Sequence, residues 1–163
     1  KKLKLLNKYS IGIEISNPGH DHGYKNFSSR QINSLEKLLK YLIKKYNIKK
    51  SNILGHSDIS PNRKKDPGEK FPWEKLAKNG LCKWHSLDAK KIKRFRNLKL
   101  NKNQKITFLK NLNNIGYSKS TTKKHKVKEM KLVVAFQRKF RQGLINGIID
   151  KECLLISQNL LKS

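Results

Sequence analysis

The sequence predicts an α/β fold class, in which a partial domain with a mixed sheet and flanking helices precedes a small three-helix domain. Two observations predict the first part: isoleucines alternate with small or polar residues at 10–16, and apolar residues recur at helical spacing through 28–46. A third observation predicts the second part, because the apolar pattern after about residue 105 has the spacing of helices. We therefore expect the α/β part at 1–85, a linker at 86–104 and the three-helix domain at 105–163.

The first element is expected to be a half-buried strand at residues 10–16. Ile11, Ile13 and Ile15 would face the core, as period-two alternation requires. Glu14 would then lie on the opposite, open face of the strand. Taken alone, a carboxylate in that position is most simply a solvated residue.

Residues 28–46 are expected to form an amphipathic helix that leads into a second strand. Ser28 and Gln31 have the spacing of a capping box, which satisfies free N–H groups at a helix N-terminus. A short strand at 52–56 would follow and would place His56 at its carboxyl end. Functional sites of open α/β sheets collect at these ends, so the loop after this strand is a candidate site.

The C-terminal part is expected to fold as three short helices. The first has a stripe of apolar residues that ends at Gly116, and the third begins at Asp150, a residue type that favours helix N-termini. Three helices of this length form a small bundle. The apolar positions that we expect to build its core are Ile106, Leu109, Leu112, Met130, Val133, Val134, Phe136, Phe140, Cys153, Leu154, Ile156 and Leu160.

The composition restricts the partners of the chain. Its formal net charge is +28, with 39 Lys and Arg against 11 Asp and Glu, and so strong a basic balance favours an anionic partner. Most of the excess is lysine spread along the whole chain, which argues against nucleic acid as the main partner; cell-wall glycan or acidic lipid headgroups fit equally well. No apolar run approaches the roughly 20 residues needed to span a membrane, so we expect no membrane span.

The loop after residue 55 contains residue types that can hold a metal. His56 and Asp66 are good zinc ligands, and a catalytic zinc takes three protein ligands and a water whose pKa it lowers. Glu14 could accept the proton of that water, and Lys64 could stabilise an oxyanion. A histidine and an aspartate ten positions apart are weak support on their own, because most such pairs lie in ordinary surface loops.

Three motifs together resemble one known family. They are Ser10-Ile-Gly-Ile-Glu-Ile, Asn17-Pro-Gly-His-x-x-Gly-Tyr and Gly55-His-Ser-Asp-Ile-x-Pro-x-Arg-Lys-x-Asp-Pro-Gly-x-x-Phe-Pro-Trp. They resemble the type 2 N-acetylmuramoyl-L-alanine amidases of the AmpD and AmiD kind, which are related to peptidoglycan recognition proteins. The resemblance implies a hydrolase that uses Zn2+ to cleave the amide between N-acetylmuramic acid and L-alanine, in peptidoglycan or in muropeptides.

The resemblance also implies roles for individual residues. His56 and Asp66 match two zinc ligands, Glu14 matches the catalytic acid/base, and Lys64 matches the residue that helps to hold the oxyanion. The substrate-binding residues that the motifs imply are His20, Tyr24 and Arg63.

The C-terminal segment is similar to the three-helix peptidoglycan-binding domain that often accompanies this amidase. The similarity rests on Val134-Ala-Phe-Gln-Arg-Lys-Phe and on Asn146-Gly-Ile-Ile-Asp-x-Glu-Cys. A generic helical tail is the alternative interpretation.

The sequence departs from the family at one point. The first zinc ligand of the family is a histidine in an early strand, and none of the nine residues before the Ser10 motif is histidine. We therefore expect an N-terminally truncated amidase, in which His20, His22 or His85 is the remaining candidate for a third ligand. A non-catalytic peptidoglycan-binding protein is the alternative function, and nucleic-acid binding ranks last. We expect the cell envelope or periplasm as the compartment, with the cytoplasm as the alternative.

Overall fold

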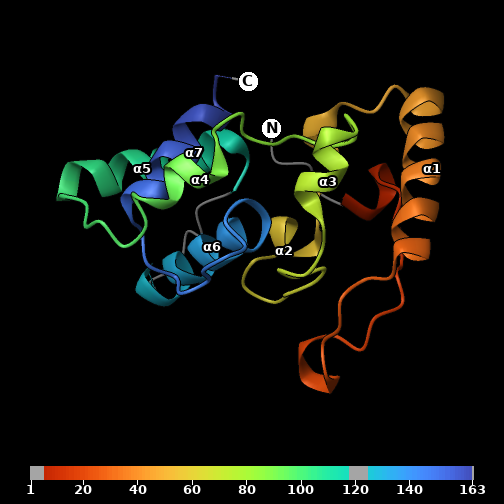
Figure 1. The fold of residues 1–163 in the computed structure, drawn as a ribbon, viewed down its shortest axis with the longest axis horizontal. Helices are drawn as coiled ribbons and strands as arrows, with labels where there is room; N and C mark the ends of the chain where they lie inside the picture. Colours follow the sequence, from red (N-terminus) through yellow and green to blue (C-terminus); the bar gives the residue numbers. More distant parts are fainter. Residues whose placement is uncertain (1–5, 118–124, 163) are drawn as a thin grey trace.

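The computed structural model of the chain describes residues 6–117 and 125–162, which form helices joined by long loops (Figure 1). The α-helices are, in chain order, α1 (Ser29–Tyr46), α2 (His56–Ile59), α3 (Trp73–Lys78), α4 (Ala89–Lys93), α5 (Lys102–Ile115), α6 (His125–Phe140) and α7 (Lys151–Leu160). Short 3-10 helices occur at Leu6–Tyr9 (η1), His20–His22 (η2) and Lys50–Asn52 (η3). None of the described helices combines the length and apolar character that crossing a bilayer needs.

The predicted α/β fold class with a mixed sheet is wrong for the residues that the structure describes. Neither 10–16 nor 52–56 forms a strand there, and the pairing seen is an isolated bridge between Lys99 and Asp150. The physical reason is that the alternation of apolar and polar residues predicts only one half-buried face. A strand also needs a neighbouring strand whose backbone pairs with its N–H and C=O groups. Residues 6–117 and 125–162 supply no such neighbour.

The alternating isoleucines still identify a buried face in part. Ile13 and Ile15 are half-buried and pack against the N-terminal core, as the alternation predicts. Ile11, the third member of the pattern, is 50% exposed. The segment therefore lies on the core through two of its side chains while its backbone remains unpaired by a sheet.

Helix α1 follows the sequence signals closely. The Ser28 hydroxyl accepts a hydrogen bond from the Gln31 N–H at 3.2 Å, and the Gln31 side chain accepts one from the Ser28 N–H at 2.9 Å, which confirms the capping box. Asn47, in the left-handed conformation, ends the helix. The buried face of α1 packs on the N-terminal core, whose members are Ile32, Leu35, Leu39, Phe71, Trp73, Leu76, Leu81 and Cys82.

The C-terminal helices form a second core, in which α5 packs along α7. Asp150 caps α7 by accepting a hydrogen bond from the Cys153 N–H at 2.9 Å, as predicted. Two predicted core residues, Ile106 and Met130, are instead exposed; Ile106 lies away from the buried face of α5, which centres on Phe108 and Leu112. The segment 86–104 contains α4 and also contributes buried side chains to this core, Ile92 and Leu100.

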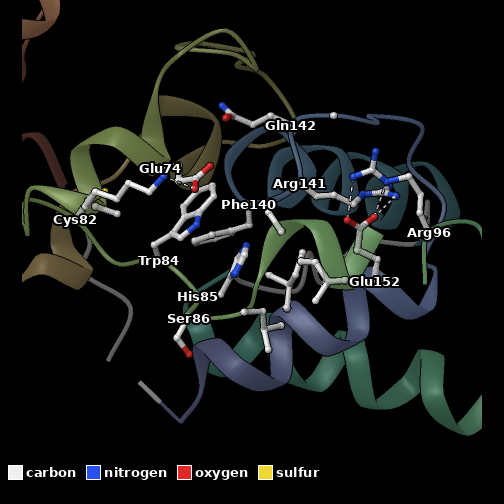
Figure 2. A pocket seen from close by; sticks show the side chains of 17 residues that line it. Glu74, Cys82, Trp84, His85, Ser86, Arg96, Phe140, Arg141, Gln142 and Glu152 are labelled. Carbon is white, nitrogen blue, oxygen red and sulfur yellow. Dashed lines mark hydrogen bonds and ion pairs between the residues drawn. The ribbon is translucent and has the colours of Figure 1, made fainter. Parts of the chain in front are cut away.

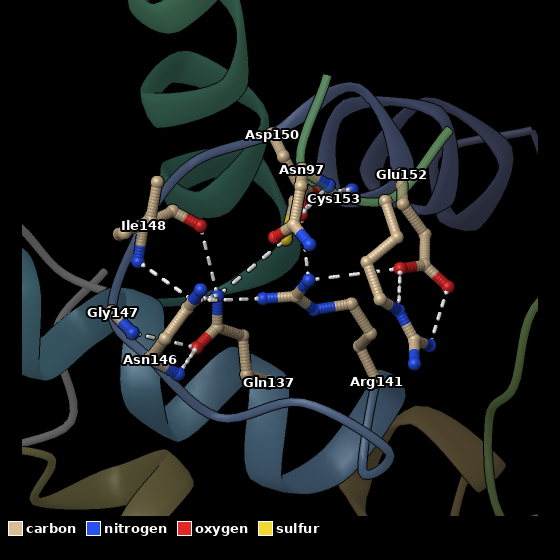
Figure 3. A network of polar contacts seen from close by, with 10 residues as sticks. Asn97, Gln137, Arg141, Asn146, Gly147, Ile148, Asp150, Glu152 and Cys153 are labelled. Atoms are coloured by element: carbon tan, nitrogen blue, oxygen red, sulfur yellow. Dashed lines mark hydrogen bonds and ion pairs between the residues drawn. The ribbon is translucent and has the colours of Figure 1, made fainter. Parts of the chain in front are cut away.

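A polar network fixes the loop between α6 and α7 (Figure 3). The Gln137 amide oxygen accepts hydrogen bonds from the N–H groups of Asn146 and Gly147 at 3.0 and 2.9 Å. Arg141 donates to the Asp150 carboxylate at 2.6 Å, and Arg96 donates twice to Glu152. Because these side chains satisfy loop N–H groups and one another, the loop returns to α7 in one defined path.

The two cores meet where α6 packs against α2 and α3 (Figure 1). Trp84 contacts both cores and stacks on His85, with ring centroids 5.0 Å apart. A cavity of about 570 Å³ opens beside these two rings and is also lined by Phe140, Gln142 and Glu74 (Figure 2). The C-terminal helices therefore lie directly against the N-terminal segment that carries the candidate site.

Candidate active site

The structure brings the two predicted metal ligands together. His56 is the first residue of α2, and its Nδ1 lies 3.0 Å from Oδ2 of Asp66. The Ser57 N–H donates to the Asp66 carbonyl at 2.9 Å, so the backbone joins the two ends of the loop beside these side chains. The side chains are 49% and 59% exposed. Both ligand groups are thus close together and open to solvent.

Two glycines allow this loop to close. A Cβ on Gly55 would lie 2.6 Å from Cδ of Pro67, closer than real Cβ atoms approach other atoms. Gly68 has φ of +82°, a left-handed conformation that costs other residues energy. A Cβ on Gly68 would also lie 2.5 Å from the Tyr24 hydroxyl oxygen. The motif therefore needs glycine at both positions for steric reasons.

The loop that contains η2 packs against the residues that follow Asp66. The Tyr24 hydroxyl donates to the Pro67 carbonyl at 2.6 Å and accepts from the Lys70 N–H at 2.9 Å. Burial raises the pKa of Tyr24 to about 12, so the phenol remains a hydrogen-bond donor at neutral pH. His20 stacks on Tyr24, with ring centroids 4.3 Å apart. These contacts hold the loop of residues 17–24 against the residues that follow Asp66.

Glu69 extends the same cluster toward α6. Its Oε2 lies 3.0 Å from Nε2 of His20 and 3.7 Å from Nε of Arg138. Burial alone would raise the pKa of Glu69, but the hydrogen bond with His20 and the nearby Arg138 hold it below its ordinary value. His20 and Tyr24, which were predicted to bind substrate, thus make their described contacts within the protein.

The remaining predicted site residues lie apart from this cluster. Glu14 is exposed and lines an open groove of about 420 Å³ between 13–16 and α1. In residues 6–117 and 125–162, no hydrogen bond or ion pair joins Glu14 to His56 or Asp66. Arg63 donates to the Ser60 hydroxyl at 3.1 Å. Lys64 is half-buried, and its N–H donates to the Ser60 carbonyl at 2.9 Å.

The donor atoms of the pair suit zinc, but the described residues supply only part of a catalytic site. An imidazole nitrogen and a carboxylate oxygen are ordinary zinc ligands, and a catalytic site takes three protein ligands. No cluster of three or more His, Cys, Asp or Glu side chains suited to a metal occurs in the described part of the chain. His85, one candidate for the third ligand, is buried beside Trp84.

Sequence reasoning missed the buried role of Asp58 in the loop and the two residues, Tyr117 and Lys139, that contact it. Asp58 accepts hydrogen bonds from the Lys139 ammonium at 2.9 Å and from the Tyr117 hydroxyl at 2.5 Å. One signal could have identified Lys139: it stands between Phe136 and Phe140, on the apolar side of the predicted helix. A lysine placed there needs a buried partner of opposite charge.

Comparison with known proteins shows which family the N-terminal part of the chain resembles. Residues 4–69 match the family described as N-acetylmuramoyl-L-alanine amidase. The chain is 34% identical over 164 residues to the N-acetylmuramoyl-L-alanine amidase AmiD of Escherichia coli, an alignment that covers 96% of this chain and 58% of AmiD. It is 41% identical over 70 residues to the 1,6-anhydro-N-acetylmuramyl-L-alanine amidase AmpD of Haemophilus influenzae, covering 42% of this chain and 36% of AmpD.

The same relationship is seen in three dimensions. The structure superimposes on E. coli AmiD in complex with its substrate anhydro-N-acetylmuramic acid-L-Ala-D-gamma-Glu-L-Lys, with a TM-score of 0.73 and 33% identity. The match covers 85% of this chain and 54% of that AmiD chain. The chain thus spans little more than half the length of AmiD. Residues 4–69 match the N-acetylmuramoyl-L-alanine amidase family, and the chain is similar to AmiD over most of its own length.

Proposed function

We propose that this chain carries part of the active site of a zinc-dependent amidase, which hydrolyses the amide between N-acetylmuramic acid and L-alanine in peptidoglycan or muropeptides. The observation that carries the proposal is the His56–Asp66 pair, 3.0 Å apart and solvent-exposed, within the segment that matches the amidase family. The anhydromuramoyl peptide bound by AmiD supports a peptidoglycan-derived substrate.

His56 and Asp66 would hold the metal as two of its protein ligands. Bound zinc would supply a Lewis acid for the scissile carbonyl. Glu14, which is exposed and makes no ion pair in the described residues, is the proposed proton acceptor, and Lys64 is the proposed oxyanion contact. Because the described residues provide no cluster of three ligands, we expect full activity only where a further ligand completes the site.

The test combines zinc content with amide cleavage of a muropeptide by the purified chain and by longer versions of the protein. His56→Ala is expected to lose zinc and activity together, whereas Glu14→Gln is expected to lower turnover by a factor of at least about 10² while sparing zinc. Glu74→Gln and Tyr41→Ala are the control variants, because both side chains are solvent-exposed and neither is a candidate ligand or substrate contact. Equal zinc content and equal activity in all four variants would contradict the proposal.

A non-catalytic role in binding peptidoglycan is the second candidate. The observation that favours it is the pair of ligands without a third in the part of the chain that the structure describes. Sedimentation of the chain with purified sacculi, without release of stem peptides, would support binding alone. Release of peptides that begin with L-alanine would support the amidase instead.

A further inference from the structure

A buried ionic cluster joins the candidate metal loop to the C-terminal helices. The Asp58 carboxylate, two positions after His56 in α2, receives three hydrogen bonds. One comes from the Gly55 N–H at 2.8 Å, one from the Tyr117 hydroxyl at 2.5 Å and one from the Lys139 ammonium at 2.9 Å. Lys139 belongs to α6, and Tyr117 follows α5, so both reach the loop from the C-terminal part.

The cluster is almost completely withdrawn from water. The side chains of Asp58 and Lys139 are 4% and 5% exposed, and Tyr117 is buried. The Lys139 ammonium also donates to the Ile53 carbonyl at 3.2 Å and lies 4.3 Å from the centroid of the Trp73 ring. The hydrogen bonds of this ammonium therefore fall on Ile53 and Asp58, on either side of His56 in the chain.

The position of Asp58 explains how the cluster reaches the ligand pair. By accepting the Gly55 N–H, its carboxylate holds the start of α2, where His56 is the first residue. The next residue, Ser57, donates its N–H to the Asp66 carbonyl. A movement of Asp58 would thus displace His56 and loosen the backbone bond that keeps Asp66 beside it.

Helix α6 and the residues just after it also contact the segment that follows Asp66. Arg138 of α6 lies 3.7 Å from Glu69, and the side chain of Gln142, which follows α6, donates to the Phe71 carbonyl at 2.7 Å. These contacts fall after Asp66, whereas the Asp58 contact falls before it. The same helix region therefore holds the loop on both sides of Asp66.

We propose that Lys139 and Tyr117 are positioning residues, which act through Asp58 to hold His56 and Asp66 in the arrangement that binds metal. Buried ion pairs add little to stability on balance, and their best-attested use is to fix one arrangement among several. Groups that orient metal ligands from behind commonly change metal affinity by factors of about 10 to 100 when removed. The metal-binding part of this inference rests on the proposed function; the loop-ordering part does not.

The experiment measures hydrogen exchange of single backbone amides by NMR on the metal-free 163-residue chain. Tyr117→Phe removes one hydroxyl and keeps the ring, and Lys139→Met removes the charge at similar length. We expect the Gly55 and Ser57 amides to exchange at least about tenfold faster in both variants, relative to the Cys153 amide of the C-terminal core. A general loss of stability would raise all three rates together, so the ratio separates positioning from folding.

Matched controls and a conservative variant complete the design. Tyr41→Phe removes an exposed hydroxyl and Lys44→Met removes an exposed charge, both on α1 and away from the loop. Both control variants should leave the exchange ratio at the parent value, and Lys139→Arg, which keeps the charge, should give a ratio close to that of the parent chain. An unchanged ratio in Tyr117→Phe and Lys139→Met would overturn the inference.

Titration with Co2+ then tests the link to metal. If the parent chain binds Co2+ through His56, the two variants should bind it at least about tenfold more weakly. Parent-level affinity in both would overturn the link between the cluster and the ligands. If the parent chain binds no metal at this loop, the proposed function fails for this chain, and the exchange ratio alone decides whether the cluster orders the loop.

Discussion

Replacing Gly68 by alanine tests the close approach of the two loops around the candidate site. The added Cβ would lie 2.5 Å from the Tyr24 hydroxyl and 2.7 Å from the His20 ring, on a backbone with φ of +82°. The left-handed conformation costs alanine about 1–2 kcal/mol relative to glycine. Displacing Tyr24 would also break its hydrogen bond to the Pro67 carbonyl, at about 1 kcal/mol.

Together these terms predict that Gly68→Ala lowers the free energy of unfolding by about 2–3 kcal/mol, or the Tm by about 4–12 °C for a chain of this size. Urea unfolding or calorimetry measures the change. Gly12→Ala is the matched control, because its Cβ would meet nothing within 4 Å and its backbone does not have positive φ; it should shift Tm by less than about 2 °C. Equal stability of the two variants would refute the packing of Tyr24 against Gly68.

Three further predictions concern buried groups. Burial lowers the pKa of His85 below its ordinary 6.5, so the folded chain disfavours protonation of this side chain. The His85 contribution to the free energy of unfolding should therefore be complete above pH 6.5 and should fall below that pH, by at most about 1.4 kcal/mol per pH unit. In urea titrations at several pH values, His85→Gln should reduce this slope. Burial raises the pKa of Cys82 to about 11 and of Cys153 to about 12, so both thiols should resist alkylation at pH 8 until the chain unfolds; rapid modification of the native chain would contradict their burial. Arg96→Met should lower the free energy of unfolding, measured by calorimetry, by about 3 kcal/mol, because the Glu152 side chain is 2% exposed and would lose both hydrogen bonds from Arg96. An unchanged Tm would show that the ion pair between Arg141 and Glu152 is enough to stabilise this carboxylate.

The local elements were predictable because their signals are local. The capping box of Ser28 and Gln31 and the αL cap at Asn47 each depend on a few consecutive residues, and both bounds of α1 follow from them. The Asp150 cap of α7 follows from the same kind of signal. Such features need no knowledge of distant partners.

The predicted sheet failed because pairing is not a local property. The pattern at 10–16 reports that one face is half-buried, and Ile13 and Ile15 do pack on a core. That core is provided by α1 and the 71–82 segment, whereas a strand would also need a second strand beside it, which the described residues do not provide. Burial of one face and backbone pairing with a second strand are separate requirements, and the alternating pattern predicts only the first.

The candidate site was predictable only along the motif. The spacing within the 55–73 motif led to His56 and Asp66, and the structure places them 3.0 Å apart. Lys139 is separated from Asp58 by 81 positions, so no local pattern could show their contact. The roles of Glu14 and Lys64 stay predictions, because neither is joined to the ligand pair in the part of the chain that the structure describes.

The most direct test of the amidase assignment is a site-resolved zinc titration of the 163-residue chain. The side-chain NMR signals of His20, His22, His56 and His85 are followed as Zn2+ is added. The account predicts that His56 responds first, with one zinc per chain, and that His56→Ala or Asp66→Ala weakens binding by at least about tenfold, whereas Tyr41→Phe, at an exposed position on α1, does not. Zinc that binds first at another histidine, or binds His56→Ala as well as the parent chain, would contradict the account.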